Sequence, residues 1–269
     1  MIDNSKGVSV LMFLLFTFLM ASCGGNEGDK IKIIEKPITS YNDIMAITDS
    51  LVVPYVYTTV ISLNNLPVVK KKQKFFDVML PAVLVAKYEL ASLLKKVEMI
   101  SIKGTPSIEE EKFIDSLKMK YKATNVDLLK SRLHTFPVSI VLAQAAIESA
   151  WGTSRFFLEA NNPFGIWSFN SNEDRIAASS TRDGKKVYLR KFKNLEQAIE
   201  GYYITLATGP FANFRRERLS TDDPYVLINY LIDYSERREA YVQELSSVIR
   251  GNDLTKYDDY IIDPQYIKH

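Results

Sequence analysis

The residue with the clearest chemical potential is Glu148, which ends an apolar stretch that predicts a helix over about 135–151. Val141 and Ala145 recur at helical spacing, and Glu148 falls on the same buried stripe. A charged side chain seldom lies on such a stripe without a partner or a function. Two interpretations stay open. Glu148 forms a structural pair, or its apolar surroundings raise its pKa so that it holds and donates a proton.

Two turns follow this helix and are expected to shape a site beside Glu148. Residues 161–165 (NNPFG) are a turn by composition. Asp183 and Gly184 lie between extended runs at 175–182 and 185–192, and an Asp-Gly pair in that setting is a strong hairpin signal. The sequence therefore places a loop and a β-hairpin directly downstream of the candidate acid.

Helical periodicity predicts the elements that hold these turns. Upstream helices are expected at 41–63, at 75–102 with a kink or a break at Pro81, at 107–122, and in a short segment from Asn125. Downstream helices are expected after a cap at Asn194, after Asp222 or Asp223, and over 236–250. The tail, 252–269, is polar and Tyr-rich, either packed or loose. The predicted fold class is α+β, predominantly α.

The N-terminus has the composition of an export signal. Residues 8–20 form an uncharged, mostly apolar run of the length of a secretory signal core, and small residues lead to Cys23. The order LMASC resembles a bacterial lipobox, in which the cysteine is lipidated. An uncleaved anchor and a plain signal peptide are the alternatives. We expect a lipid-anchored protein of the bacterial cell envelope, attached to the membrane through Cys23, on the periplasmic face or the cell surface.

Residues 143–152 (AQAAIESAWG) together with the NNPFG turn resemble the signature of FlgJ-type glucosaminidases, and the Bax branch in particular, over about 70–250. The resemblance implies a lysozyme-like domain with a small β-hairpin lobe and extra N-terminal helices, which hydrolyses β-1,4 bonds of peptidoglycan glycan strands. Glu148 matches the catalytic acid. The expected organisation is a signal peptide (1–22), a tether (23–38), a helical N-terminal region packed on the enzyme (39–123), the glucosaminidase domain (124–251) and the tail.

The resemblance also implies the residues that bind the substrate: Trp151, Asn161, Asn162, Phe164 and Tyr202. Each has a simpler interpretation from the sequence. Trp151 and Phe164 suit core packing, and Tyr202 falls on the inner face of its predicted helix. The two asparagines suit either turn hydrogen bonding or contacts with sugar amides.

One departure concerns the second carboxylate that glycosidases usually pair with the acid. In FlgJ-type enzymes it lies on the hairpin, but alignment on the Asp-Gly turn places Ser180 there. Glu173 and Asp174 are the nearest candidates, and the 2-acetamido group of the substrate is an alternative nucleophile. A tyrosine of the family after the helix that ends near Gly209 is also replaced, by Phe211 or Phe214.

Composition excludes several other functions. The chain has a net charge of only +2, which does not indicate a surface that binds nucleic acid. Its only histidines are His134 and His269, which excludes a zinc site built from several histidines. No cofactor and no metal are expected, and protein partners are unknown. Two alternatives to hydrolysis stay open: a lytic transglycosylase that uses Glu148 alone, and an envelope lipoprotein that binds peptidoglycan without cutting it.

Overall fold

The computed structural model describes residues 30–182 and 184–268. The predicted signal peptide, Cys23 and the first part of the predicted tether, residues 23–29, therefore lie outside the described residues, and these assignments stay predictions. The rest of the predicted tether, residues 30–38, contains two short strands that pair with other segments, so a loose tether is wrong for this part. None of the helices within the described ranges is long and apolar enough to cross a membrane.

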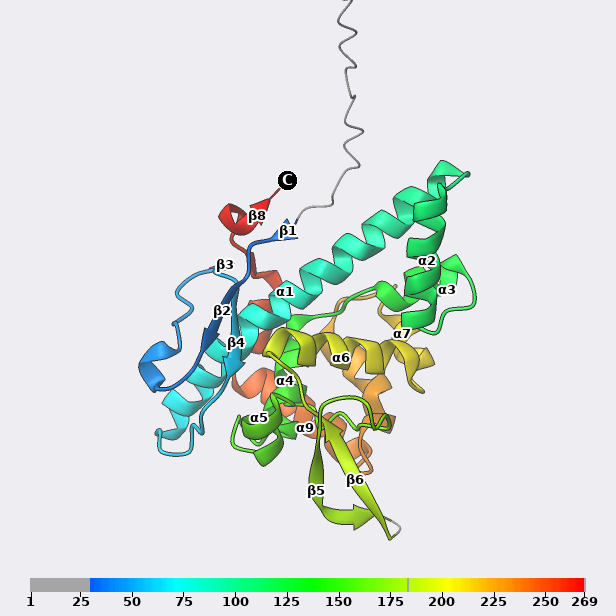
Figure 1. The fold of residues 1–269 in the computed structure, drawn as a ribbon. Helices are drawn as coiled ribbons and strands as arrows, with labels where there is room; N and C mark the ends of the chain where they lie inside the picture. Colours follow the sequence, from blue (N-terminus) through cyan, green and yellow to red (C-terminus); the bar gives the residue numbers. More distant parts are fainter. Residues whose placement is uncertain (1–29, 183, 269) are drawn as a thin grey trace, which may run out of the picture.

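Helices dominate the described chain, and short strands lie near its two ends and in one hairpin (Figure 1). The α+β, predominantly α fold class is confirmed. The α-helices are α1 (Val68–Lys103), α2 (Ile108–Lys120), α3 (Val126–Leu133), α4 (Val138–Glu148), α5 (Arg155–Ala160), α6 (Leu195–Thr208), α7 (Ala212–Glu217), α8 (Pro224–Leu227) and α9 (Glu239–Gly251). The 3₁₀ helices are η1 (Tyr41–Asp43), η2 (Ile228–Tyr234), η3 (Leu254–Asp259) and η4 (Pro264–Tyr266). The strands are β1 (Lys30–Ile31), β2 (Ile34–Pro37), β3 (Leu51–Val52), β4 (Tyr55–Thr59), β5 (Arg175–Arg182), β6 (Lys185–Arg190), β7 (Ile261–Ile262) and β8 (Ile267–Lys268).

The long helix α1 runs from the strand region to the corner formed with α2 and α3 (Figure 1). It continues through Pro81, so of the two predicted alternatives the break is wrong. Proline in a helix interior removes one backbone donor and costs about 3 kcal/mol. The residues on both sides of Pro81 are buried, and their packing offsets that cost. The predicted helices at 107–122 and from Asn125 are confirmed as α2 and α3.

The predicted helix at 41–63 is wrong, because this segment forms only η1 and the short strands β3 and β4. β4 pairs in parallel with β2, whereas β3 pairs with β7 from the C-terminal tail. β1 likewise pairs with β8. The segment contains Pro54 and β-branched residues, which favour extended backbone once a partner strand is present. The tail supplies that partner, so it is packed, which is the first of its two predicted alternatives.

Helix α4 lies at the centre of the fold and contacts α1, α9 and η3. Its residues from Val138 to Ala146 are buried. The tail holds its first turn, because the Asp258 carboxylate accepts hydrogen bonds from the backbone amide of Ser139 at 2.7 Å and from its hydroxyl at 2.8 Å. A carboxylate at a helix N-terminus binds amides that have no partner within the helix. The helix predicted over about 135–151 is thus shorter in the structure, since α4 begins after Pro137 and ends at Glu148.

The hairpin and the downstream helices follow local signals closely. β5 and β6 form an antiparallel pair at the predicted positions around Asp183 and Gly184. Asn194 caps α6 by accepting a hydrogen bond from the amide of Gln197 at 3.0 Å, as predicted. Asp223 caps α8, and α9 ends at Gly251. In Figure 1 the hairpin projects from the body beside α5 and α9.

Candidate active site

Glu148 is the last residue of α4, and its side chain is half-buried. Burial raises the pKa of this carboxyl above its ordinary value. A hydrogen bond from Tyr241 and the charge of Arg237 oppose that rise, and the charge of Glu244 adds to it. The environment therefore favours the protonated acid and still provides a donor for the carboxylate that forms when the proton leaves.

A chain of buried hydrogen bonds leads to Glu148 from the interior. The Tyr202 hydroxyl donates to Oε1 of Gln144, and Nε2 of Gln144 donates to the Tyr241 hydroxyl at 2.9 Å. The Tyr241 hydroxyl in turn donates to Glu148. We call Tyr202, Gln144 and Tyr241 the relay. All three are 0% exposed, so each polar atom depends on its neighbour in the chain.

Aromatic rings enclose the relay. The Phe164 ring stacks on Tyr202, with centroids 4.1 Å apart and planes 15° apart. The Tyr234 ring stacks on Tyr241 at 5.6 Å and 8°. Burial raises the pKa of Tyr241 far above its ordinary value, so its hydroxyl keeps its proton and stays a donor.

The turn after Glu148 has left-handed backbone at three successive residues. The φ angles of Ala150, Trp151 and Gly152 are 48°, 59° and 77°. Left-handed φ is unfavourable for residues with a Cβ, and such strain often lies at functional sites. The Ser149 hydroxyl supports the turn, because it donates to the carbonyl of Ala145 at 2.6 Å and accepts from the amide of Gly152 at 2.9 Å.

Trp151 faces the long helix α1. Its ring lies edge-on to Phe75 and Phe76, with centroids 5.9 Å and 5.7 Å away, and Nζ of Lys72 lies 4.6 Å from the ring centre. This contact holds the left-handed turn against α1. The structure therefore gives Trp151 a packing role, the simpler of its two interpretations, and its contact with substrate stays a prediction.

Asn161 and Asn162 use their side chains to hold the loop between α5 and the hairpin. Nδ2 of Asn161 donates to the carbonyls of Thr58 at 2.8 Å and Phe192 at 3.0 Å. Asn162 is 1% exposed; its Nδ2 donates to the carbonyls of Ile166 and Arg190, and its Oδ1 accepts from the Ile166 amide at 2.9 Å. Of the two alternatives left by the sequence, turn hydrogen bonding is the one that the structure supports.

Residues 123–254 match the family described as mannosyl-glycoprotein endo-β-N-acetylglucosaminidase. This segment is a glucosaminidase-family domain. The chain is similar to the exo-glucosaminidase LytG of Bacillus subtilis, with 27% identity over 202 residues, 69% of this chain and 65% of LytG. It is similar to the protein Bax of Escherichia coli, with 28% identity over 131 residues and 46% of each chain. The chain thus spans less than two thirds of the length of these relatives. The predicted resemblance to the Bax and FlgJ-type family is confirmed.

A solved structure that aligns with the chain is the catalytic domain of the autolysin Auto from Listeria monocytogenes. The alignment covers 57% of this chain and 90% of that one, at 23% identity and a TM-score of 0.40.

The two candidates for a second catalytic carboxylate, Glu173 and Asp174, contact residues other than Glu148. Glu173 forms an ion pair with Nε of Arg190 at 3.0 Å. Asp174 lines a cavity of about 240 Å³ together with Asn161 and residues of β4. Among the described residues, the carboxylate that shifts the pKa of Glu148 is Glu244, which is paired with Arg237 at 2.5 Å. A catalytic role for Glu173 or Asp174 therefore stays a prediction without support from these contacts.

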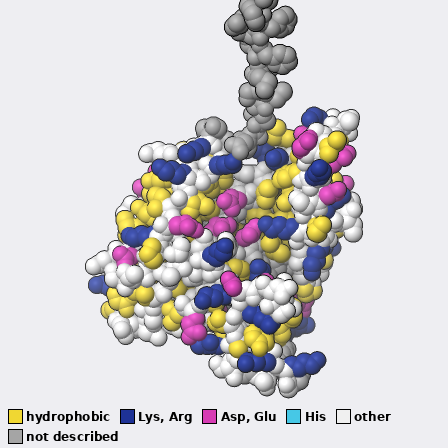
Figure 2. All heavy atoms as spheres, viewed as in Figure 1, with side chains coloured by type: hydrophobic (Ala, Val, Ile, Leu, Met, Phe, Trp, Pro, Cys, Tyr) yellow, Lys and Arg dark blue, Asp and Glu magenta, His cyan; other side chains and the backbone are white. Residues whose placement is uncertain are grey.

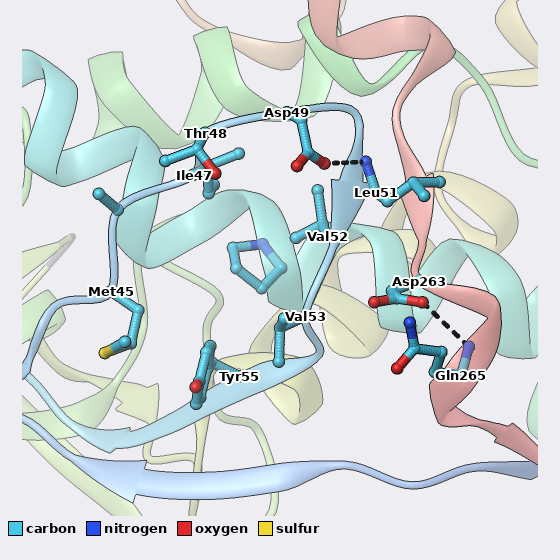
Figure 3. A pocket seen from close by; sticks show the side chains of 12 residues that line it. Met45, Ile47, Thr48, Asp49, Leu51, Val52, Val53, Tyr55, Asp263 and Gln265 are labelled. Atoms are coloured by element: carbon cyan, nitrogen blue, oxygen red, sulfur yellow. Dashed lines mark hydrogen bonds between the residues drawn. The ribbon is translucent and has the colours of Figure 1, made fainter.

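A second cavity, of about 410 Å³, lies on the N-terminal side of the molecule (Figure 3). It is lined by most of residues 45–55, by Pro81, and by Asp263 and Gln265 of the tail. Two carboxylates border it, and both accept hydrogen bonds from backbone amides. Asp49 accepts from the amide of Leu51 at 2.7 Å, and Asp263 accepts from the amide of Gln265 at 3.0 Å. Neither cavity includes Glu148. Across the described ranges, no three His, Cys, Asp or Glu side chains gather as metal ligands.

The sequence did not indicate the groups that surround Glu148 in the structure. Gln144 belongs to the family signature and lies one helical turn before Glu148, so its amide on a buried stripe was a usable signal. Tyr241 and Glu244 come from α9, and no local pattern connects them to Glu148. Phe211 packs on Tyr234 at 5.9 Å, so the position where a family tyrosine was expected borders the same aromatic cluster.

Proposed function

We propose that this protein hydrolyses β-1,4 glycosidic bonds of peptidoglycan glycan strands, as an endo-β-N-acetylglucosaminidase with Glu148 as the general acid. The observation that carries the proposal is the half-buried Glu148 carboxyl, with its pKa raised by burial, at the end of the relay in a glucosaminidase-family domain. Glycosidases use such a carboxyl to protonate the leaving oxygen.

In the proposed reaction Glu148 donates its proton to the glycosidic oxygen as the bond to the anomeric carbon breaks. The resulting carboxylate accepts the hydrogen bond from Tyr241, which the relay holds in place. Water, or the 2-acetamido group of the substrate, attacks the anomeric carbon. Tyr202 lies too deep to contact a sugar and is a positioning residue in this scheme.

The test is digestion of purified sacculi by the wild-type protein and by Glu148→Gln, with products identified by mass spectrometry. The wild type should release fragments with reducing N-acetylglucosamine ends, and Glu148→Gln should release none. Glu98→Gln, on an exposed position of α1, is the matched control and should behave as wild type. The length distribution of the fragments separates internal cleavage from the terminal cleavage that the name of LytG indicates. Equal release by Glu148→Gln would refute the assignment.

A lytic transglycosylase is the second candidate, because the hydroxyl of muramic acid then attacks and a single carboxyl suffices. The observation that favours it is the engagement of Glu173 and Glu244 in ion pairs with Arg190 and Arg237. Anhydromuramic ends in the products would identify this reaction. Binding to sacculi without any fragment release would instead indicate a lipoprotein that binds peptidoglycan and does not cut it.

A further inference from the structure

The hairpin segment carries more positive charge than the chain as a whole. Residues 173–193 contain seven Lys or Arg against three Asp or Glu, a net charge of +4, whereas the entire chain has +2. The remainder of the chain is therefore net negative. Figure 2 shows Lys and Arg side chains gathered at the hairpin end of the molecule. A charge so concentrated on one projecting element raises the local concentration of anions.

Strand geometry gathers part of this charge on one face of the hairpin. Lys186, Tyr188 and Arg190 alternate along β6 and share a face, whereas Leu189 points to the opposite face and is 5% exposed. Arg175 pairs directly with Arg190 across the ladder. The Arg175 guanidinium lies 4.0 Å from the centre of the Tyr188 ring, and Nζ of Lys186 lies 5.8 Å from it. We call Arg175, Lys186, Tyr188 and Arg190 the cationic face.

Two arginines directly opposite each other repel across an antiparallel pair. Glu173 compensates Arg190 through the ion pair at 3.0 Å, while Arg175 lies over an aromatic ring. An anion from outside the chain would offset the remaining repulsion. The Tyr188 ring between the cations also offers an apolar surface to the ligand that carries the anion.

The cationic face is fixed to the frame that holds Glu148. Nδ2 of Asn162 donates to the carbonyl of Arg190 at 2.9 Å. Phe164, two residues after Asn162 in the chain, stacks on Tyr202, the first residue of the relay. The strand that carries the cationic face is therefore connected, through the segment from Asn162 to Phe164, to the relay that contacts Glu148.

We infer that the cationic face binds the carboxylates of the peptide stems that a peptidoglycan strand carries, and so favours peptide-bearing over bare glycan. This inference rests on the proposed function and names the substrate class within it. Stem carboxylates are sparse along the strand, which suits a short face with few cations. A nucleic acid carries a phosphate about every 3.4 Å of each strand and needs a longer basic surface, which a net-negative remainder of the chain does not provide.

The test uses Arg175→Gln/Lys186→Gln, with Lys95→Gln/Lys112→Gln as the matched control on the exposed surfaces of α1 and α2. The kcat and KM are measured on soluble peptide-bearing glycan and on the same glycan stripped of peptides, over a range of NaCl concentrations. Arg175→Lys/Lys186→Arg keeps the charges and reports whether the hairpin tolerates substitution.

We expect Arg175→Gln/Lys186→Gln to lose about tenfold in kcat/KM on peptide-bearing glycan at low salt, through KM, and to lose much less at about 0.5 M NaCl. Stripped glycan should be cut at the wild-type rate, and the control and the charge-keeping variant should match wild type. Equal losses on both substrates, or no loss on either, would overturn the inference. So would a single-stranded DNA that competes more strongly than free stem peptide.

If the wild-type protein cuts neither substrate, the proposed function fails and the cationic face is judged by binding alone. Sedimentation with intact sacculi at low salt should then retain wild type and the control and release the Arg175→Gln/Lys186→Gln variant. Equal retention of all three proteins would refute the inference independently of any activity.

Discussion

Replacing Tyr241 with phenylalanine removes a single oxygen from the relay and leaves the ring that packs on Tyr234. That hydroxyl donates to Glu148 and accepts from Gln144. A hydrogen bond to a charged group contributes about 1.5–3 kcal/mol. The bond favours the carboxylate that forms in the transition state, and about 1.4 kcal/mol corresponds to a tenfold change in rate. Tyr241→Phe should therefore lower the maximal rate about 10- to 100-fold.

The same substitution should move the pH dependence in a defined direction. Tyr241 favours the ionised form of Glu148 and thereby opposes the effect of burial on its pKa. Without the hydroxyl the pKa of Glu148 rises further. A general acid must hold its proton, so activity falls as pH rises through that pKa. The alkaline limb of kcat/KM should therefore shift to higher pH in Tyr241→Phe while the plateau falls.

The assay is the pH profile of kcat/KM on soluble glycan, with Tyr203→Phe as the control. Tyr203 is also buried, but its hydroxyl has no hydrogen-bond partner among the described residues. Tyr241→Phe leaves Nε2 of Gln144 without an acceptor, which costs about 1–3 kcal/mol, so urea unfolding must show that the variant is folded at the assay temperature. If Tyr241→Phe matched Tyr203→Phe in both rate and alkaline limb, the relay would have no part in catalysis.

Three further predictions concern other parts of the chain. Burial and the charges of Glu89 and Glu200 raise the pKa of Glu196 from its ordinary value of 4.5 to about 8, and the charge of Lys120 opposes this rise. Between pH 4.5 and about 8 the folded protein therefore binds more protons than the unfolded chain does. The free energy of unfolding should thus fall as pH rises from 4.5 to about 8, and Glu196→Gln should flatten that fall in urea titrations at pH 5 and pH 9; parallel curves for both proteins would contradict it. Asn162→Ala deletes three hydrogen bonds to buried backbone and should cost about 3 kcal/mol by thermal unfolding, whereas Asn172→Ala on the exposed loop should change little. Cys23→Ser should abolish palmitate labelling and release the protein from the membrane fraction, and unchanged labelling would rule out Cys23 as the lipidated residue.

Local signals in the sequence located the elements around the site closely. The start of a short helix at Asn125, the cap at Asn194 and the Asp-Gly hairpin appear where the sequence predicts them. Each depends on contacts within a few residues, which composition records directly. Glu148 on an apolar stripe was visible for the same reason, since helical spacing alone brings it onto the buried side of α4.

Features that depend on distant segments were not visible. The helix predicted at 41–63 fails because β3 pairs with β7, which lies some two hundred residues later in the chain. The relay crosses a similar gap, because Gln144 and Tyr241 are separated by 97 residues. The burial of Asn162 likewise needs the hairpin strand that carries Arg190. Helical periodicity and capping rules carry no information on such pairings. The sequence therefore left two roles open for Asn161 and Asn162, turn hydrogen bonding and contact with sugar amides.

The contacts of α4 argue that the folding unit is larger than the family match at residues 123–254. Asp258, beyond that match, holds the first turn of α4 through two hydrogen bonds to Ser139. Phe75 and Phe76, before it, hold the turn that follows Glu148 through the ring of Trp151. The tail and the N-terminal strands also complete each other as β1–β8 and β3–β7. Both ends of the helix that carries Glu148 are therefore fixed by segments outside the family match, which makes the flanking regions part of the structure that positions the acid.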